Sequence, residues 1–234
     1  MALKLCHLSQ PRTGVVPLKN SMCSLILGIT AWLTVSLADA ATPANPQVSI
    51  KTEKGDILVE LFSKAAPISV DNFIKNVNSY HYDGLIFHRV IKNFMVQTGG
   101  FTFDLTSRPS ERDPIINEGN NGLKNKRGTL AMARTSDPNS AMAQFFINHK
   151  TNRFLDASDN KAGYAVFGKV VTGMAVVDSI AGVETTTKKG YQNVPIKPIR
   201  ILSARLVNPS VWTPLPEAKP EANVLSFERP VPVK

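Results

Sequence analysis

The feature that most restricts the fold of this chain is a series of short strand-like runs. Residues 48–52 and 57–61 flank Lys54-Gly55-Asp56, a pattern that predicts a β-hairpin. Further strand candidates lie at 85–91, 94–98, 129–133, 144–148, 164–168 and 196–207. Strands do not alternate regularly with helices, and no internal repeat is present, so a doubly wound parallel sheet is disfavoured.

Two segments interrupt the strands with a helical pattern. Pro67 suits the first turn of a helix, and Val70, Phe73, Ile74 and Val77 follow at the spacing of one helix face. A shorter helix is expected over 173–180, ended by Gly182. Seven or eight short strands with two helices favour a mainly β fold, a closed barrel with the helices as caps.

The first forty residues have the pattern of a secretory signal peptide. Lys4, Arg12 and Lys19 precede a sixteen-residue uncharged run at 22–37, and Ala38-Asp39-Ala40 supplies a small-x-small cleavage site. The run is shorter than the ~20 residues that a membrane-spanning helix needs. We therefore expect cleavage after Ala40 and no stable membrane insertion afterwards, with an uncleaved anchor or a buried helix as the alternatives.

Cleavage changes the cysteine count and the charge. Both cysteines, Cys6 and Cys23, precede the cleavage site, so the mature chain contains no thiol. Removing three basic residues and Asp39 from the 27 basic and 18 acidic residues leaves 24 and 17, a net charge of +7. A thiol-free chain suits an oxidising compartment. We expect a periplasmic protein, with secretion beyond the envelope as a second possibility.

The mature chain divides into three parts. Residues 41–47 form a short linker, 48–207 form the folded domain, and 208–234 form a tail that contains six of the 16 prolines. Such a tail cannot form a continuous helix or a central strand, so we expect an extended, partly disordered segment. Docking of Trp212, Leu215 and Phe227 on the domain or on a partner is the alternative.

Several common kinds of site are excluded by pattern. The mature histidines, His81, His88 and His149, have no metal-ligand spacing, and no metal or other cofactor is expected. Gly99-Gly100 lacks the third glycine of a dinucleotide fingerprint, and no P-loop or G-x-S-x-G turn is present. Basic residues are scattered, and no aromatic stacking platform accompanies them, which disfavours a nucleic-acid partner and indicates a solvated surface, or weak attraction to anionic envelope components.

The most informative stretch is 87–100, FHRVIKNFMVQTGG. If it is a strand, Phe87, Arg89 and Ile91 share one face, and His88 and Val90 share the other. On this reading His88 is a hydrogen-bonded structural histidine and no acid–base group. The blocks GTLAMAR (128–134), AQFFIN (143–148), RFLD (153–156) and YAVFGKV (164–170) follow.

With these five blocks, the sequence resembles the cyclophilin family of peptidyl-prolyl cis-trans isomerases, specifically its bacterial exported branch. The resemblance extends over about 160 residues in family order. It implies an eight-stranded antiparallel barrel closed by two helices, and an enzyme without a cofactor that accelerates X–Pro isomerisation in exported proteins as they fold. We expect proline-containing polypeptides as substrates and a monomeric protein.

The resemblance also implies roles for single residues. Arg89 matches the catalytic arginine, and Phe94, Met95, Phe146 and Leu155 match the pocket for the substrate proline ring. Polar residues beside the peptide correspond to Gln97 and Gln144, and the strand that pairs with substrate backbone corresponds to Ala133 and Arg134. Taken singly, these residues are more often surface or core residues; their joint order carries the interpretation.

Three of the substrate-binding positions implied by the resemblance, Arg134, Phe154 and Tyr164, depart from common family members. Arg134 stands where asparagine is usual, a tolerable change if only backbone groups bind substrate there. Phe154 and Tyr164 stand where many eukaryotic members have tryptophan and histidine, as in the bacterial exported branch. Because that tryptophan donates an indole N–H to cyclosporin, the resemblance implies weak cyclosporin binding. Two alternatives stay open: a proline-peptide-binding chaperone module with little catalysis, and a ligand-carrying barrel of lipocalin type.

Overall fold

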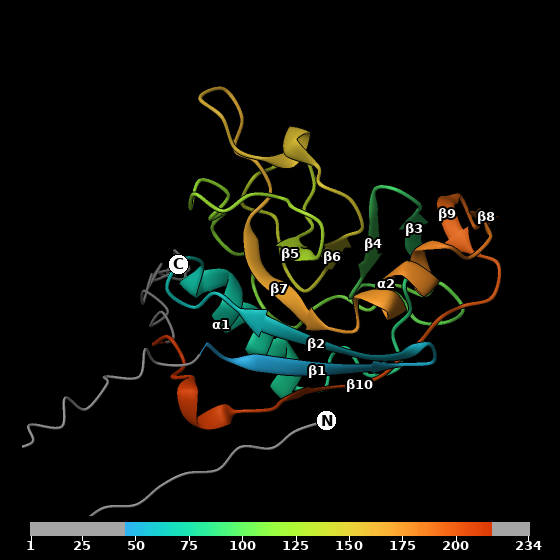
Figure 1. Ribbon diagram of the computed structural model, residues 1–234, viewed down its shortest axis with the longest axis horizontal. Coiled ribbons are helices and arrows are strands. Elements are labelled where there is room, and N and C mark those ends of the chain that lie inside the picture. The colour runs from blue at the N-terminus through green and yellow to red at the C-terminus, as the bar shows by residue number, and fades with distance from the viewer. Residues whose placement is uncertain (1–44, 217–234) are drawn as a thin grey trace, which may run out of the picture. The chain divides into compact units, whose positions relative to one another are not determined.

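The computed structural model describes residues 45–216 (Figure 1). The predicted signal peptide, the first part of the linker and Phe227 lie outside these residues. Ten strands are found in the described part. They are β1 (Gln47–Thr52), β2 (Gly55–Leu61), β3 (Arg89–Ile91), β4 (Met95–Thr98), β5 (Thr129–Met132), β6 (Phe145–Asn148), β7 (Val166–Thr172), β8 (Thr185–Lys188), β9 (Tyr191–Pro195) and β10 (Ile201–Leu206).

Eight of the strands form one antiparallel sheet, in the order β10-β1-β2-β7-β5-β6-β4-β3. The predicted first hairpin is present, with Ile50 opposite Ile57 and Thr52 opposite Gly55 across the β1–β2 ladder. The fold is therefore mainly β, as the sequence predicts. Strand alternation is clear in β1 and β2, where every second side chain is buried.

The expected closure of the barrel is wrong, because the sheet is an open half-barrel with β3 and β10 as its end strands. The segment before β3 meets the start of β10 in one isolated antiparallel bridge, Ile86 opposite Arg200, where the Ile201 N–H also donates to the Leu85 carbonyl at 2.8 Å. Gly84 N–H donates to the Ile201 carbonyl at 2.8 Å, and Phe87 N–H to the Ile199 carbonyl at 3.0 Å. Pro195 and Pro198 lack the N–H groups that a continuous ladder would need, so β10 begins later than expected.

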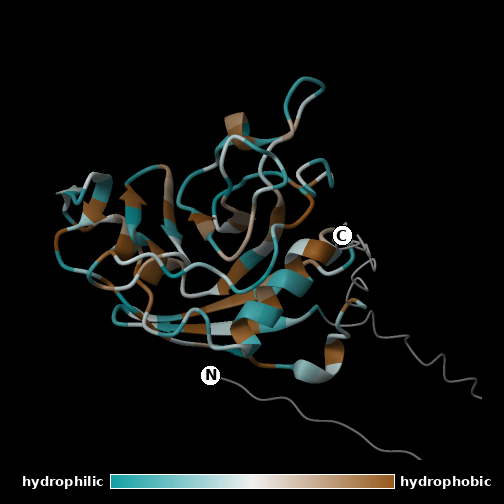
Figure 2. Ribbon diagram, turned by 180° about the vertical axis from the view of Figure 1, so that it is seen from behind, coloured by the Kyte–Doolittle hydropathy of each residue, from teal (hydrophilic) through white to brown (hydrophobic). Residues whose placement is uncertain are grey.

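The two predicted helices are present as α1 (Pro67–Asn78) and α2 (Met174–Ala181). Val70, Phe73, Ile74 and Val77 of α1 are all at most 1% exposed. Seen from behind, α1 lies across the sheet and turns hydrophilic residues outward (Figure 2). The Glu118 carboxylate accepts the N–H groups of the first turn of α1, which have no partner within the helix.

The start of α2 depends on a glycine. Gly173 has φ +95, and a Cβ there would lie 2.3 Å from the Asp56 carbonyl oxygen. A side chain would therefore meet both backbone strain and a clash with the backbone at the start of β2. Gly182 follows the helix as its C-cap.

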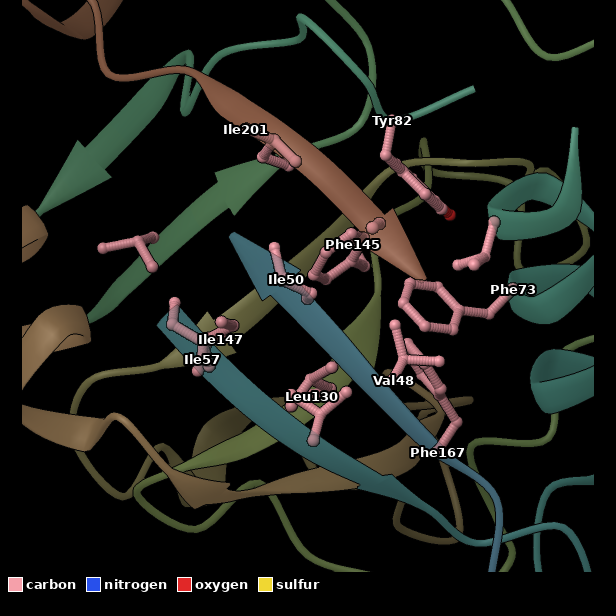
Figure 3. Packing of buried hydrophobic residues seen from close by; sticks show 14 of the residues in the cluster. Val48, Ile50, Ile57, Phe73, Tyr82, Leu130, Phe145, Ile147, Phe167 and Ile201 are labelled. Atoms are coloured by element: carbon pink, nitrogen blue, oxygen red, sulfur yellow. The ribbon is translucent and has the colours of Figure 1, made fainter. Parts of the chain in front are cut away.

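The concave side of the sheet and α1 enclose the main core. Phe73 of α1 lies within 5.2 Å, between ring centroids, of each of Tyr82, Phe145 and Phe167. Figure 3 shows these rings pointing toward one another beside aliphatic side chains from β1, β2, β5, β6 and β10. Packed side chains fill the interior, which leaves the lipocalin-type alternative without support.

The β8–β9 hairpin was not predicted. All four residues of β8 are exposed, so the strand lacks the apolar alternation that marks a half-buried strand. Lys189 and Gly190, both with positive φ, make the turn between the two strands. The hairpin packs through Val194 against Ile86 and Leu105.

The first part of the tail is docked on the domain. A 3₁₀ turn at Pro209–Val211 leads to Trp212, which packs against the main core. Leu215 N–H donates to the Asp71 carboxylate of α1 at 2.9 Å. For 208–216 the structure therefore favours the docking alternative over disorder.

Candidate active site

The candidate site lies on the convex face of the sheet, opposite the main core. In β3 and β4, Val90 and Val96 point into the core, which turns Arg89 and Gln97 outward. Arg89 lies opposite Gln97 across the β3–β4 ladder, and Gln97 lies opposite Phe146 of β6. The next partner in this row is Ala131 of β5. Antiparallel register therefore places the arginine, an amide and an aromatic ring side by side.

A second apolar cluster forms the floor of the site. Met95, Ala131, Phe146, Leu155 and Val166 are its buried members, and partly buried aromatic rings surround them. The cluster bounds a hollow of about 130 Å³. The residues that line this hollow are Arg89, Phe94, Met95, Gln97, Ala133, Arg134, Phe146, Leu155 and Tyr164, all of them predicted site residues.

The other two predicted residues lie beside this hollow. Gln144 lines an adjoining hollow of about 300 Å³, and Gln97, Ala133 and Arg134 line both. Phe154 is 62% exposed, and its ring stacks on Phe94 with centroids 5.5 Å apart. It thus extends the apolar surface outward from the pocket rim. A larger hollow of about 560 Å³, near the β1–β2 turn, contains none of the predicted residues.

The Arg89 guanidinium is held at the rim by apolar neighbours. Its Nη1 lies 4.0 Å from the Met95 sulfur, and its Cζ lies 5.9 Å from the centre of the Phe94 ring. No ion pair within residues 45–216 includes Arg89. The guanidinium therefore keeps N–H groups free for a ligand, because neither a thioether nor a ring face satisfies them fully.

Two amides form the polar side of the site. Gln97 Nε2 donates to Gln144 Oε1 at 3.0 Å, which orients both side chains. The Ala133 N–H donates to the Gln144 carbonyl at 2.9 Å, although the regular part of β5 ends at Met132, one residue earlier than expected. This bond keeps 133 and 134 beside the pocket after the ladder ends.

Arg134 is fixed more firmly than Arg89. Its Nε and Nη2 donate to the Gly163 carbonyl at 3.3 and 3.0 Å, and Nη1 donates to the Thr135 carbonyl at 2.9 Å. Its Cζ lies 4.5 Å from the centre of the Tyr164 ring, a cation–π contact. The side chain therefore forms the wall between the two hollows.

A buried amide network that was not predicted supports the pocket rim. Asn152 Nδ2 donates to the Phe94 carbonyl at 2.9 Å and to Asn148 Oδ1 at 2.7 Å. Asn148 Nδ2 continues to Asn125 Oδ1 at 3.1 Å. The Asn125 N–H donates to Asp156, which follows the 3₁₀ turn Arg153–Leu155. In the sequence, the available signal for this network was an asparagine, Asn148, directly after the apolar run 145–147, which indicates an amide at the end of a buried strand.

Comparison with known proteins assigns the chain to a family. A family model described as "Cyclophilin type peptidyl-prolyl cis-trans isomerase/CLD" matches residues 47–206. The chain belongs to the cyclophilin family.

Similar proteins carry the corresponding activity in their names. The chain is 53% identical over 170 residues to "Peptidyl-prolyl cis-trans isomerase" of Acinetobacter baylyi, covering 73% of this chain and 90% of that protein. It is 50% identical over 182 residues to "Peptidyl-prolyl cis-trans isomerase A" of Dickeya dadantii, covering 78% and 93%. This cyclophilin is therefore a peptidyl-prolyl cis-trans isomerase.

A solved structure shows the same fold. A cyclophilin-type isomerase of Cryptosporidium parvum, crystallised in the presence of the dipeptide Ala-Pro, matches with a TM-score of 0.57 and 28% identity. The match covers 68% of this chain and 98% of that one.

His88 of this cyclophilin differs from the expectation. Residues 87 and 88 precede the strand, so the predicted alternation fails there and Phe87 joins the main core together with Val90. His88 is 6% exposed and packs against the Phe101 ring at 4.7 Å between centroids. Its Nδ1 has no hydrogen-bond partner, so the histidine is not fully hydrogen-bonded as expected. Burial is the main cause that lowers the pKa of His88 to about 4.

Within 45–216, no three His, Cys, Asp or Glu side chains come together as metal ligands. In the same range, neither helix combines the length and the apolar character needed to cross a membrane.

Proposed function

We propose that Arg89 accelerates X–Pro isomerisation by stabilising a twisted amide whose proline ring is held in the 130 Å³ hollow. The observation that carries this proposal is that a guanidinium without an ion-pair partner lies at the rim of an apolar pocket, and an apolar pocket suits a proline ring. An alternative is a chaperone module that binds proline peptides with little catalysis.

The chemistry of the reaction requires few groups. Rotation about the X–Pro bond meets a barrier of ~18–20 kcal/mol because the amide has partial double-bond character. In the twisted state conjugation is lost, and the prolyl nitrogen gains a lone pair that accepts a hydrogen bond. No bond is broken, so the reaction needs neither a nucleophile nor a general base.

Arg89 supplies the interaction that distinguishes the twisted amide from the two planar states. Its guanidinium is positively charged and donates toward the developing lone pair. Selective stabilisation of the twisted state lowers the barrier, whereas equal binding of all states would not. To shorten the isomerisation time from tens of seconds to about a millisecond, the enzyme must raise the rate by roughly four orders of magnitude, which means lowering the activation barrier by ~5–6 kcal/mol.

The pocket and the amides hold the substrate while the bond rotates. Met95, Phe146 and Leu155 offer an apolar floor to the proline ring. Gln97 and Gln144 offer amide groups to the peptide backbone on the other side of Arg89. The Ala-Pro dipeptide named with the Cryptosporidium structure supports a proline-containing ligand for this site.

The test is an isomerase assay on the chain from residue 41 to 234 with a proline tetrapeptide. Arg89→Ala is expected to lower kcat/KM by about 10²–10³-fold while the circular dichroism spectrum stays unchanged. Arg89→Lys should recover only part of the loss, because a lysine lacks the planar donor array. Arg127→Ala, which lies outside both hollows, serves as the control. Near-normal turnover by Arg89→Ala would refute the mechanism.

The same variant separates catalysis from binding in the cell. If Arg89→Ala complements a deletion strain as well as the wild type does, the chaperone alternative is favoured. If it fails while its level and fold are normal, turnover is the function.

We also propose that this cyclophilin acts on exported proteins as a monomer in the periplasm. The basic, apolar and small-residue segments of 1–40 and the absence of cysteine after Ala40 support export. Mass spectrometry of the protein from fractionated cells should give a mature chain that begins at Ala41, in the periplasmic fraction. A chain that keeps residues 1–40 in the membrane fraction would favour the anchor alternative.

A further inference from the structure

The wall between the two hollows carries a fixed positive charge that the isomerase mechanism does not use. Arg134 reaches both hollows, and its side chain is held by the carbonyl groups of Gly163 and Thr135 and by the ring of Tyr164. Gly163 has φ +64, and a Cβ there would lie 2.4 Å from the Ala157 nitrogen. The acceptor of Arg134 is thus fixed by a turn that only glycine fits well.

The hydrogen bonds of Arg134 hold the charge without neutralising it. All its partners are neutral carbonyl oxygens, and no ion pair within residues 45–216 includes it. Nη1 makes a fourth bond, to the Ser136 carbonyl at 3.5 Å; since a guanidinium has five N–H groups, one N–H on Nη2 is left unused.

The surroundings of both hollows are electropositive. Two arginines and no aspartate or glutamate are among the described residues that line them. Asp137 and Asp156 lie on neighbouring loops and line neither hollow; their carboxylates accept the Asn139 N–H at 2.9 Å and the Asn125 N–H at 2.7 Å. A bound peptide would exclude water here, and the field of Arg134 would then act with less screening.

We propose that Arg134 makes this enzyme select substrates that carry Asp or Glu within two residues of the Xaa-Pro pair, on the side that occupies the 300 Å³ hollow. The hollow places Gln97, Gln144 and Arg134 around one substrate side chain. A substrate carboxylate there would accept the unused N–H of Arg134 and be attracted by its charge, whereas a substrate lysine would be repelled by that charge. The inference rests on the proposed binding of proline peptides at this site.

The experiment measures substrate preference. NMR exchange spectroscopy gives kcat/KM for hexapeptides that carry Glu, Gln or Lys at each of the two positions before and after Xaa-Pro. With the wild type at low salt, we expect the Glu peptide to exceed the Gln peptide about three- to tenfold at one position, mainly through KM. The preference should shrink at 0.5 M salt, because ions screen an exposed pair.

Variants assign the preference to Arg134. Arg134→Gln is expected to bring the Glu/Gln ratio to about one, Arg134→Lys to keep part of it, and Arg134→Glu to favour the Lys peptide. Arg153→Gln, an exposed arginine outside both hollows, is the control and should keep the wild-type ratio. Because each result is a ratio for one enzyme, a general loss of activity does not affect it.

Two outcomes would overturn the proposal. Equal rates for Glu, Gln and Lys peptides at every position would show that the wild type has no charge preference. A preference that persists in Arg134→Gln would assign it to another residue. In both cases isomerisation itself proceeds, so the proposed function would stand; if no peptide is turned over, the proposed function fails first.

Discussion

Gln97 and Gln144 face each other through one hydrogen bond, from Nε2 to Oε1 at 3.0 Å, across the boundary of the two hollows. The bond fixes which amide groups each side chain presents to a peptide. We expect Gln97→Ala and Gln144→Ala each to lower kcat/KM by about tenfold, since each loses about 1–1.5 kcal/mol of hydrogen bonding. The double variant should lose less than the product of the two. Strictly multiplicative losses in the double-mutant cycle would show that the amides act independently.

The Asn152 side chain is expected to set both the stability and the shape of the pocket rim. Asn152→Ala leaves the Phe94 carbonyl and Asn148 Oδ1 without their donor inside the protein. The free energy of unfolding in urea should fall by about 2–4 kcal/mol, and kcat/KM should fall because Phe94 loses its anchor. Asn160→Ala, in an exposed loop, is the matched control and should change neither quantity. An equal effect of both variants would contradict the role of the network.

His88 is expected to make the protein less stable in acid. Its pKa of about 4 lies below the ordinary value of 6.5, so between these values the unfolded chain binds a proton that the folded protein does not. The contribution is complete above pH 6.5 and is lost as the pH falls toward 4, about 3 kcal/mol in all. Urea unfolding of the wild type and of His88→Gln at several pH values isolates the contribution of His88, because all other titratable groups are the same in the two proteins. Parallel stability curves would argue against it.

Trp212 is expected to contribute to stability and not to turnover. It packs against the main core and lines neither hollow of the site. Trp212→Ala should lower the free energy of unfolding by about 1–3 kcal/mol, less than the cost for a fully buried ring. Val211→Ala, at the exposed neighbouring position, should change it by less than about 0.5 kcal/mol. A loss of kcat/KM in Trp212→Ala without unfolding would instead connect the tail to the site.

Phe154 is expected to limit cyclosporin binding. The ring is exposed and stacked on Phe94, but it has no polar hydrogen to donate. Phe154→Trp adds an indole N–H beside the pocket, and one hydrogen bond is worth about 1 kcal/mol, or roughly fivefold in affinity. Inhibition of both enzymes by cyclosporin gives the comparison. Phe154→Leu, which changes the apolar side chain without adding a donor, is the control, and unchanged inhibition of Phe154→Trp would show that this position does not limit binding.

Local pattern was sufficient for the elements that bury one face. The first hairpin, α1 and α2 lie within two residues of their expected limits, because alternation and helical spacing follow directly from burial. The β8–β9 hairpin escaped prediction, since exposed strands such as Thr185–Lys188 carry no apolar signal. That β3 and β10 do not pair to close the barrel was also missed, because strand pairing depends on contacts between segments far apart in the chain.

The sequence by itself determined the mainly β class, both helices and the set of residues that resembles a proline-binding site. Only the tertiary structure decided how those residues meet. Arg89, Gln97 and Phe146 become neighbours because antiparallel register aligns three strands that are far apart in the chain. The fixation of Arg134 by Gly163 and the burial of His88 with an unpaired nitrogen follow from long-range packing, which no local pattern encodes.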